Sequence, residues 1–123
     1  MILVDTSVWV DHLRRNNPDL VARLRAQLVL VHPFVVGELA CGNLRQRTDF
    51  LRMLRSLPAA TRASDDEASH LLEQHQLWGK GIGWVDAHLL ASALLSRGRL
   101  WTLDQRLAEI AFDIEINARQ RAS

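Results

Sequence analysis

Short apolar runs alternate with longer amphipathic stretches along this chain of 123 residues. The run at positions 2–4, Ile-Leu-Val, contains no polar residue, as expected of a strand that is buried on both faces. Segments 28–31 and 100–102 predict two further strands, and the stretches between them carry apolar residues at helical spacing. Strands that alternate with helices in this way are typical of an α/β fold built on a parallel sheet.

Capping residues and helix breakers set the expected helix boundaries. Ser64 with Glu67 forms a capping box, Asp104 is placed to cap a late helix, and Pro58 and Gly98 follow two helix ends. We expect helices at 6–15, 19–28, 33–40, 48–57, 65–78, 85–97 and 105–112. Segments 59–63 and 114–116 are predicted to form short additional strands.

The chain length leaves room for one domain, which we place at residues 1–118, with a frayed tail at 119–123. No apolar run approaches the roughly 18–20 residues that a membrane-spanning helix needs, so we expect no contact with a membrane. Cys41 is the single cysteine, which excludes an intrachain disulfide and favours a reducing, cytoplasmic location.

The charges nearly balance, with 15 Lys and Arg against 14 Asp and Glu, which argues against a polycation or a disordered charged linker. Lys80 is the only lysine, so the basic residues are almost all arginines. Codon bias explains that preference as well as phosphate recognition by planar guanidinium groups does, and composition does not decide between them.

Four acidic residues are poorly explained by a solvated surface. Asp5 and Asp104 each follow a predicted buried strand, and the carboxyl ends of parallel strands form the ligand crevice of an α/β sheet. Asp86 begins an apolar helix stripe, and Glu38 shares a helix face with apolar or small residues. Each acid alone also has a structural explanation: a helix cap for Asp5 or Asp104, a helix-dipole partner for Asp86, and a buried ion pair for Glu38.

Taken together, the four acids point to a metal site. Carboxylates gathered on one rim repel each other, and a divalent cation relieves that repulsion. A ligand set of oxygens, without thiols or a zinc-like histidine pattern, favours Mg²⁺ or Mn²⁺ over Zn²⁺. Such a site suits phosphodiester hydrolysis, because a bound ion lowers the pKa of water and neutralises charge on the phosphate.

Four segments that carry these acids occur in the order found in one family: 4–9 (VDTSVW), 37–39 (GEL), 86–91 (DAHLLA) and 101–104 (WTLD). Together they resemble the PIN-domain ribonucleases, and the chain length and early Asp5 resemble the VapC toxins of bacterial toxin–antitoxin pairs. The resemblance covers residues 1–116.

The resemblance implies a three-layer PIN-like fold, with a short, mainly parallel sheet flanked by helices. It implies a Mg²⁺- or Mn²⁺-dependent endoribonuclease toxin, with an RNA substrate, a cognate VapB-type antitoxin and a homodimer. The implied metal-binding catalytic acids are Asp5, Glu38, Asp86 and Asp104, and the implied supporting hydroxyls are Thr6 and Thr102. Of the four acids, we expect Asp5 and Asp86 to be direct ligands, and Glu38 and Asp104 to complete the shell or hold waters.

Two other classes of function stay open. A receiver domain of a phospho-signalling pathway also has an acidic pocket in an α/β fold, but it needs paired acids after the first strand and a lysine at a late strand end. Asp5 has no acidic neighbour, and Lys80 lies in the glycine-rich segment 79–83, which also lacks the P-loop pattern. A non-catalytic RNA- or protein-binding module is the second alternative.

Arginines are the candidate RNA contacts. They gather around the predicted helix 48–57 and at the end of the first helix, as Arg45, Arg47, Arg52, Arg55, Arg14 and Arg15. A solvated helix face explains most of them equally well. Some arginines at the rim would still be needed to bring phosphates to an acidic cleft.

Overall fold

A parallel sheet of three short strands lies at the centre of the computed structural model, which describes residues 1–119. The strands are β1 (Ile2–Val4), β2 (Val29–Leu30) and β3 (Arg99–Trp101), in the order β2-β1-β3. In the register of the sheet, Leu3 pairs with Leu30 on one side and with Leu100 on the other. The first strand is therefore central, and residues near the two ends of the chain meet beside it.

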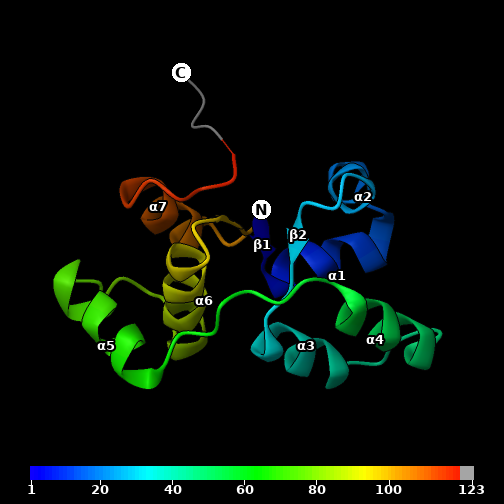
Figure 1. The fold of residues 1–123 in the computed structure, drawn as a ribbon, viewed down its shortest axis with the longest axis horizontal. Coiled ribbons are helices and arrows are strands. Elements are labelled where there is room, and N and C mark those ends of the chain that lie inside the picture. Colours follow the sequence, from blue (N-terminus) through cyan, green and yellow to red (C-terminus); the bar gives the residue numbers. More distant parts are fainter. Residues whose placement is uncertain (120–123) are drawn as a thin grey trace.

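Helices cover both sides of this sheet. Figure 1 shows the first four helices on one side and the last three on the other, with α6 packed against the strands. This is the three-layer α/β arrangement expected from the sequence. The helices are α1 (Thr6–Arg15), α2 (Pro18–Arg25), α3 (Pro33–Ala40), α4 (Arg47–Ser56), α5 (Asp65–Gln74), α6 (Trp84–Leu95) and α7 (Gln105–Asp113).

The core consists of the strands and the inner helix faces. Trp9 of α1, Leu90 of α6 and Leu107 of α7 are fully buried with Leu3 and Leu100 of the sheet. Seven consecutive residues of α6 are buried, five of them Ala or Leu, with His88 and Ser92 as the polar members. None of the helices within residues 1–119 is long and apolar enough to cross a membrane.

Two predicted strands are absent from the described residues as regular elements. Segment 59–63 makes a single parallel bridge, between Val31 and Ala59. It then leaves the sheet, because the hydroxyls of Ser96 and Ser92 accept hydrogen bonds from the next amides, Thr61 N at 2.8 Å and Ala63 N at 3.1 Å.

The predicted strand 114–116 is also reduced to one bridge, between Leu100 and Asn117. Ile114 and Glu115 still bond to the last turn of α7, so the chain becomes extended too late to pair further. Helix α5 likewise ends at Gln74, earlier than position 78, because Gln76 adopts a left-handed φ of 52°.

The predicted frayed tail falls outside the described residues except for Arg119. The Arg119 guanidinium lies 3.0 Å from Asp19 Oδ2 and stacks 5.1 Å above the Trp101 ring. At this point the chain is therefore still attached to the body of the domain.

Alanine substitutions at two glycines are expected to change the free energy of unfolding in opposite directions. A Cβ added at Gly98 would lie 2.8 Å from the Met1 carbonyl oxygen, whereas a Cβ at Gly37 of α3 would meet no atom within 4 Å. We expect Gly98→Ala to destabilise the fold by about 1–3 kcal/mol, because β1 and β3 must move apart. Gly37→Ala should stabilise it by about 0.5–1 kcal/mol, because alanine favours a helix interior. Urea unfolding of both variants measures these changes, and equal midpoints would contradict the strand contact.

Candidate metal centre

Asp5 is the most firmly held of the four predicted acids. It follows β1, its side chain is buried, and its backbone N–H donates to the Trp101 carbonyl oxygen of β3 at 2.9 Å. Asp5 Oδ2 accepts hydrogen bonds from Ser7 Oγ and Thr102 Oγ1, each at 2.7 Å. Asp5 occupies the N-cap position of α1 without capping it through its side chain. Its carboxylate is therefore oriented for a role other than helix capping.

The two hydroxyls beside Asp5 connect the ends of β1 and β3. Ser7 Oγ accepts from the Leu103 N–H at 2.9 Å, and Thr102 Oγ1 accepts from the Asp104 N–H at 3.0 Å. Each hydroxyl has one proton, and both protons are directed at Asp5 Oδ2. Within the described residues Oδ1 receives no hydrogen bond, so this oxygen is left to accept from outside the protein.

Asp86 lies in the first turn of α6, where its Oδ2 accepts from the Gly83 N–H at 3.0 Å. Its pKa is raised above the ordinary value. Burial is the largest cause, and the negative charges of Asp5 and Asp104 add to it, while the bond from Gly83 acts in the opposite direction. Asp86 therefore lies within electrostatic range of both Asp5 and Asp104, and a cation beside Asp86 would relieve the repulsion.

Asp104 follows β3 and caps α7. Its Oδ1 accepts from the Leu107 N–H at 3.1 Å, so the capping interpretation of its sequence position is correct. The cap occupies one carboxylate oxygen. The second oxygen of Asp104 has no hydrogen bond within the described part of the chain.

Glu38 differs from its sequence expectation, because it is exposed and has no buried arginine partner among the described residues. Its Oε1 accepts from Thr6 Oγ1 at 3.1 Å, which ties it to the residue after Asp5. Glu38 and Thr6 line a groove of about 440 Å³ between α1, α3 and the segment that follows α3. The groove therefore begins beside the acidic rim.

These residues fit a magnesium-type ion by their chemistry. Across residues 1–119, no group of three or more His, Cys, Asp or Glu side chains lies close enough together to hold a metal ion by itself. Mg²⁺ does not require such a group, because it keeps several waters and takes about one or two carboxylates directly. Asp5 and Asp86 are the two carboxylates best suited, because they are the most buried of the four and each keeps one oxygen without a hydrogen bond from the described residues.

The sequence reasoning missed two residues that support the rim. Ser7 is not among the predicted supporting hydroxyls, yet its hydroxyl orients Asp5; the run of hydroxyl residues directly after a strand-end acid is the available signal. Gly83 positions Asp86 through its backbone N–H. Almost every residue has this group, so the sequence does not reveal its role. His88 is two residues beyond Asp86, but its ring packs against Phe34 and Trp84 and does not join the acids.

Comparisons with known proteins agree on this architecture. The PIN domain profile matches residues 2–113. Ribonuclease VapC32 of Mycobacterium tuberculosis, from strains CDC 1551 / Oshkosh and H37Rv, is 46% identical over 108 residues, which is 87% of this chain and 87% of that protein. The crystal structure of PAE2754 from Pyrobaculum aerophilum superposes with a TM-score of 0.59 at 16% identity, covering 88% of this chain and 77% of that one. That last likeness concerns the fold alone.

Proposed function

The chain belongs to the PIN-domain family, and from that premise we propose that it is a divalent-metal-dependent endoribonuclease, the toxin of a VapBC-type toxin–antitoxin pair. The observation that carries the proposal is the identity to a VapC ribonuclease along nearly the whole chain. Membership of this family also decides against the receiver-domain alternative, because the match extends from β1 to the end of α7 and so includes all four acids.

Asp5 and Asp86 are proposed to bind the ion directly, and Glu38 and Asp104 to complete the site or hold its waters. Mg²⁺, or Mn²⁺ in its place, supplies an activated water and charge neutralisation at the scissile phosphate when bound. The protein supplies the orientation. Ser7 and Thr102 fix Asp5, Gly83 fixes Asp86, and Thr6 fixes Glu38.

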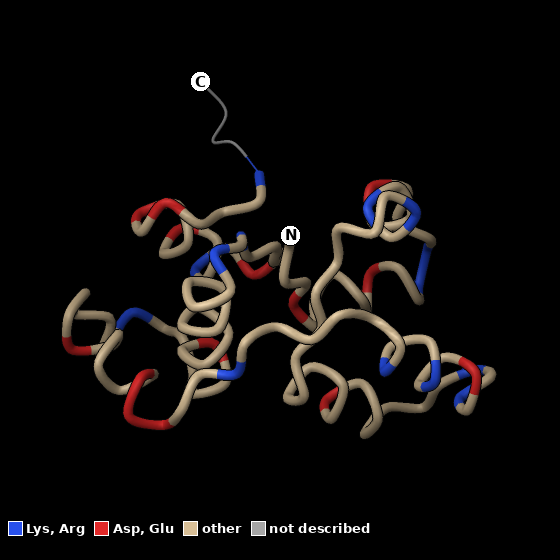
Figure 2. Tube along the Cα trace, viewed as in Figure 1, with Lys and Arg blue, Asp and Glu red and all other residues tan. Residues whose placement is uncertain are grey.

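Single-stranded RNA suits the groove that begins at Glu38. Arg14 and Arg45 line it together with the apolar side chains of Leu13 and Leu44. Guanidinium groups suit phosphates, and an apolar floor suits a base. Of the other predicted arginines, Arg47 is committed to backbone carbonyls: its guanidinium donates to Ala40 O at 2.7 Å. Figure 2 shows the remaining basic residues of α4 gathered at the end of the molecule opposite α5.

A VapB-type antitoxin and a second copy of the chain are the proposed protein partners. The apolar positions of segments 19–28 and 48–57 are candidates for these contacts; Leu20, Leu51 and Leu54 among them are buried in the core, whereas Leu28 is exposed. Exposed apolar surface also occurs on α6, where Leu94 and Leu95 border a cavity of about 330 Å³ against α5. This surface supports the homodimer proposal, because the interfaces of homodimers are enriched in apolar residues.

Metal dependence tests the proposed activity. We expect purified protein to produce new RNA ends in total cellular RNA when Mg²⁺ or Mn²⁺ is present, none in EDTA, and the same ends again when excess Mg²⁺ is added back. Sequencing of the RNA ends reports the result. Cleavage that persists in EDTA would contradict the metal role, and an inert protein with both ions would favour the non-catalytic binding module.

A further inference from the structure

Arg106, in the first turn of α7, lies directly against the backbone of Gly81. A Cβ added at Gly81 would lie 2.6 Å from Arg106 Nη1 and 2.7 Å from Arg106 Cδ. Gly81 also has a left-handed φ of 81°, which side-chain-bearing residues rarely adopt. Both the conformation and the close approach require glycine. The backbone of this loop therefore packs directly against the Arg106 guanidinium and fixes its position, and we call this contact its seat.

The same loop positions the catalytic rim. Two residues after Gly81, the Gly83 N–H donates a hydrogen bond to Asp86 Oδ2. The negative charge of Asp104 contributes to the raised pKa of Asp86. Arg106 is two residues after Asp104, and both line an open cavity of about 620 Å³ with Gly81 and Glu109. One glycine-rich segment therefore contacts Arg106, which shares a cavity with Asp104, and also holds Asp86.

Folding stability does not explain where this arginine lies. Within residues 1–119 the Arg106 guanidinium makes no hydrogen bond and no ion pair. A positive side chain in the first turn of a helix also opposes the helix dipole. A group that is seated, exposed and unpaired beside an acidic site has its donors available for an anionic ligand.

We propose that Arg106 binds a phosphate of the RNA next to the acidic rim, and that Gly81 is the positioning residue that seats it. The inference rests on the proposed ribonuclease function. The guanidinium fork matches a phosphodiester with two parallel hydrogen bonds, and its charge offsets the repulsion between the RNA backbone and the carboxylates. The acids act at the scissile phosphate, while Arg106 holds a neighbouring one.

Kinetics on a defined RNA test this role. The substrate is a short oligoribonucleotide that carries a cleavage site mapped in total cellular RNA, and kcat/KM is measured with Mg²⁺ over a series of KCl concentrations. We expect Arg106→Gln to lower kcat/KM by about 10- to 100-fold, the range for removing a charged hydrogen-bonded pair. The slope of log kcat/KM against log [KCl] should become shallower by about 0.7, the value for one fewer phosphate neutralised on a single strand.

Two further variants separate charge from geometry. Arg106→Lys keeps the charge and loses the fork, so it should keep the salt slope of the wild-type protein with an intermediate kcat/KM. Gly81→Ala displaces the intact guanidinium and should behave like Arg106→Gln. The matched control is Arg25→Gln on α2, an exposed arginine with the same change of charge and no part in the site, which should leave both measurements unchanged.

The outcomes distinguish this inference from its premise. A wild-type protein that cleaves no RNA with either ion overturns the proposed function and the role of Arg106 with it. Wild-type cleavage combined with an unaltered salt slope in Arg106→Gln and Gly81→Ala overturns the role of Arg106 alone. Normal cleavage by Arg106→Gln with weakened binding of the antitoxin also overturns it, because the arginine would then serve a protein partner.

Discussion

Asp86→Asn is expected to abolish RNA cleavage while the fold becomes no less stable. The asparagine oxygen can still accept the hydrogen bond from Gly83, but the amide neither binds Mg²⁺ as a carboxylate does nor carries its charge. A loss of about 1,000-fold in kcat/KM corresponds to the several kcal/mol that a metal site contributes to phosphate chemistry. RNA cleavage with Mg²⁺ measures the loss, and undiminished cleavage would contradict the proposed site.

The stability of Asp86→Asn follows from the raised pKa of the native carboxyl. In the folded protein its pKa lies above the ordinary value of 3.8, so ionisation of Asp86 disfavours the folded state. That cost is absent below the ordinary pKa and fully present above the raised one. In EDTA, the Tm of Asp86→Asn should therefore match the wild type at low pH and exceed it at neutral pH.

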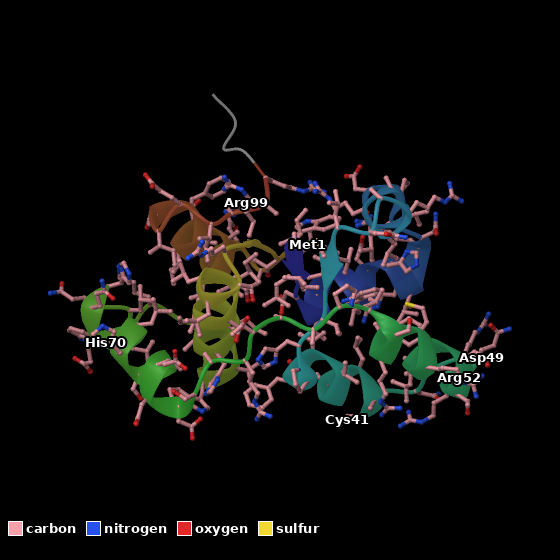
Figure 3. The ribbon with its side chains drawn as sticks, viewed as in Figure 1. Met1, Cys41, Asp49, Arg52, His70 and Arg99 are labelled. Atoms are coloured by element: carbon pink, nitrogen blue, oxygen red, sulfur yellow. The ribbon has the colours of Figure 1, made fainter. Side chains whose placement is uncertain are left out.

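Asp49→Asn is the matched control for this experiment. Figure 3 shows Asp49 at the outer end of α4, far from Met1 and the sheet. Its carboxylate is largely exposed and lies 3.8 Å from Arg52, a separation that contributes little to stability. We expect cleavage and Tm to stay at wild-type values, because the same chemical change is made away from the acids.

Trp101→Ala is expected to cause the largest loss of stability among the predicted changes. Trp101 ends β3, is 1% exposed, and lies beneath the guanidinium of Arg23 at 4.8 Å. Truncating a buried tryptophan costs about 3–5 kcal/mol, a large share of the roughly 5–15 kcal/mol that stabilises a domain of ordinary size. Urea unfolding measures this loss, and RNA cleavage should fall with it, because Asp5 N–H bonds to the main chain at position 101 and loss of the indole allows that end of β3 to shift.

Trp78→Ala provides the comparison. Trp78 is 61% exposed and follows α5. Its removal should change the free energy of unfolding by no more than about 0.5 kcal/mol, as is usual at the surface. Equal unfolding midpoints for the two tryptophan variants would contradict the assignment of Trp101 to the core.

The fold class and the three main strands were predictable because their sequences carry local signals. An unbroken apolar run such as 2–4 is typical of a buried strand, and Ser64 and Glu67 form the capping box that their spacing predicts. The strand predicted at 59–63 was wrong because tertiary contacts override the local pattern. Backbone amides of this segment donate to the hydroxyls of Ser92 on α6 and Ser96 at the C-terminal end of α6. These bonds replace sheet hydrogen bonds, and the sequence of the segment alone does not predict them.

The sequence also predicted where two of the four acids lie. The position of Asp5 and Asp104 after strands placed them at one edge of the sheet, and the structure brings both within electrostatic range of Asp86. Their role as metal ligands stays a prediction. The exposure of Glu38 was not foreseen, because its neighbours in sequence are apolar while its neighbours in space are not. The contact between Gly81 and Arg106 joins residues 25 positions apart, so it becomes visible only in three dimensions.

The hydroxyl pair that joins the ends of β1 and β3 has a consequence for synthesis on the ribosome. Asp5 is synthesised well before the Thr102 hydroxyl that orients it, which is 97 positions later in the chain. The parallel partner strand β3 and the cap of α7 are equally late. A nascent chain that has emerged only as far as α6 lacks half of this network, and parallel pairing over such a separation is slow to form. The hydrogen bonds that orient Asp5 therefore form only after the chain has been synthesised through β3 and Thr102.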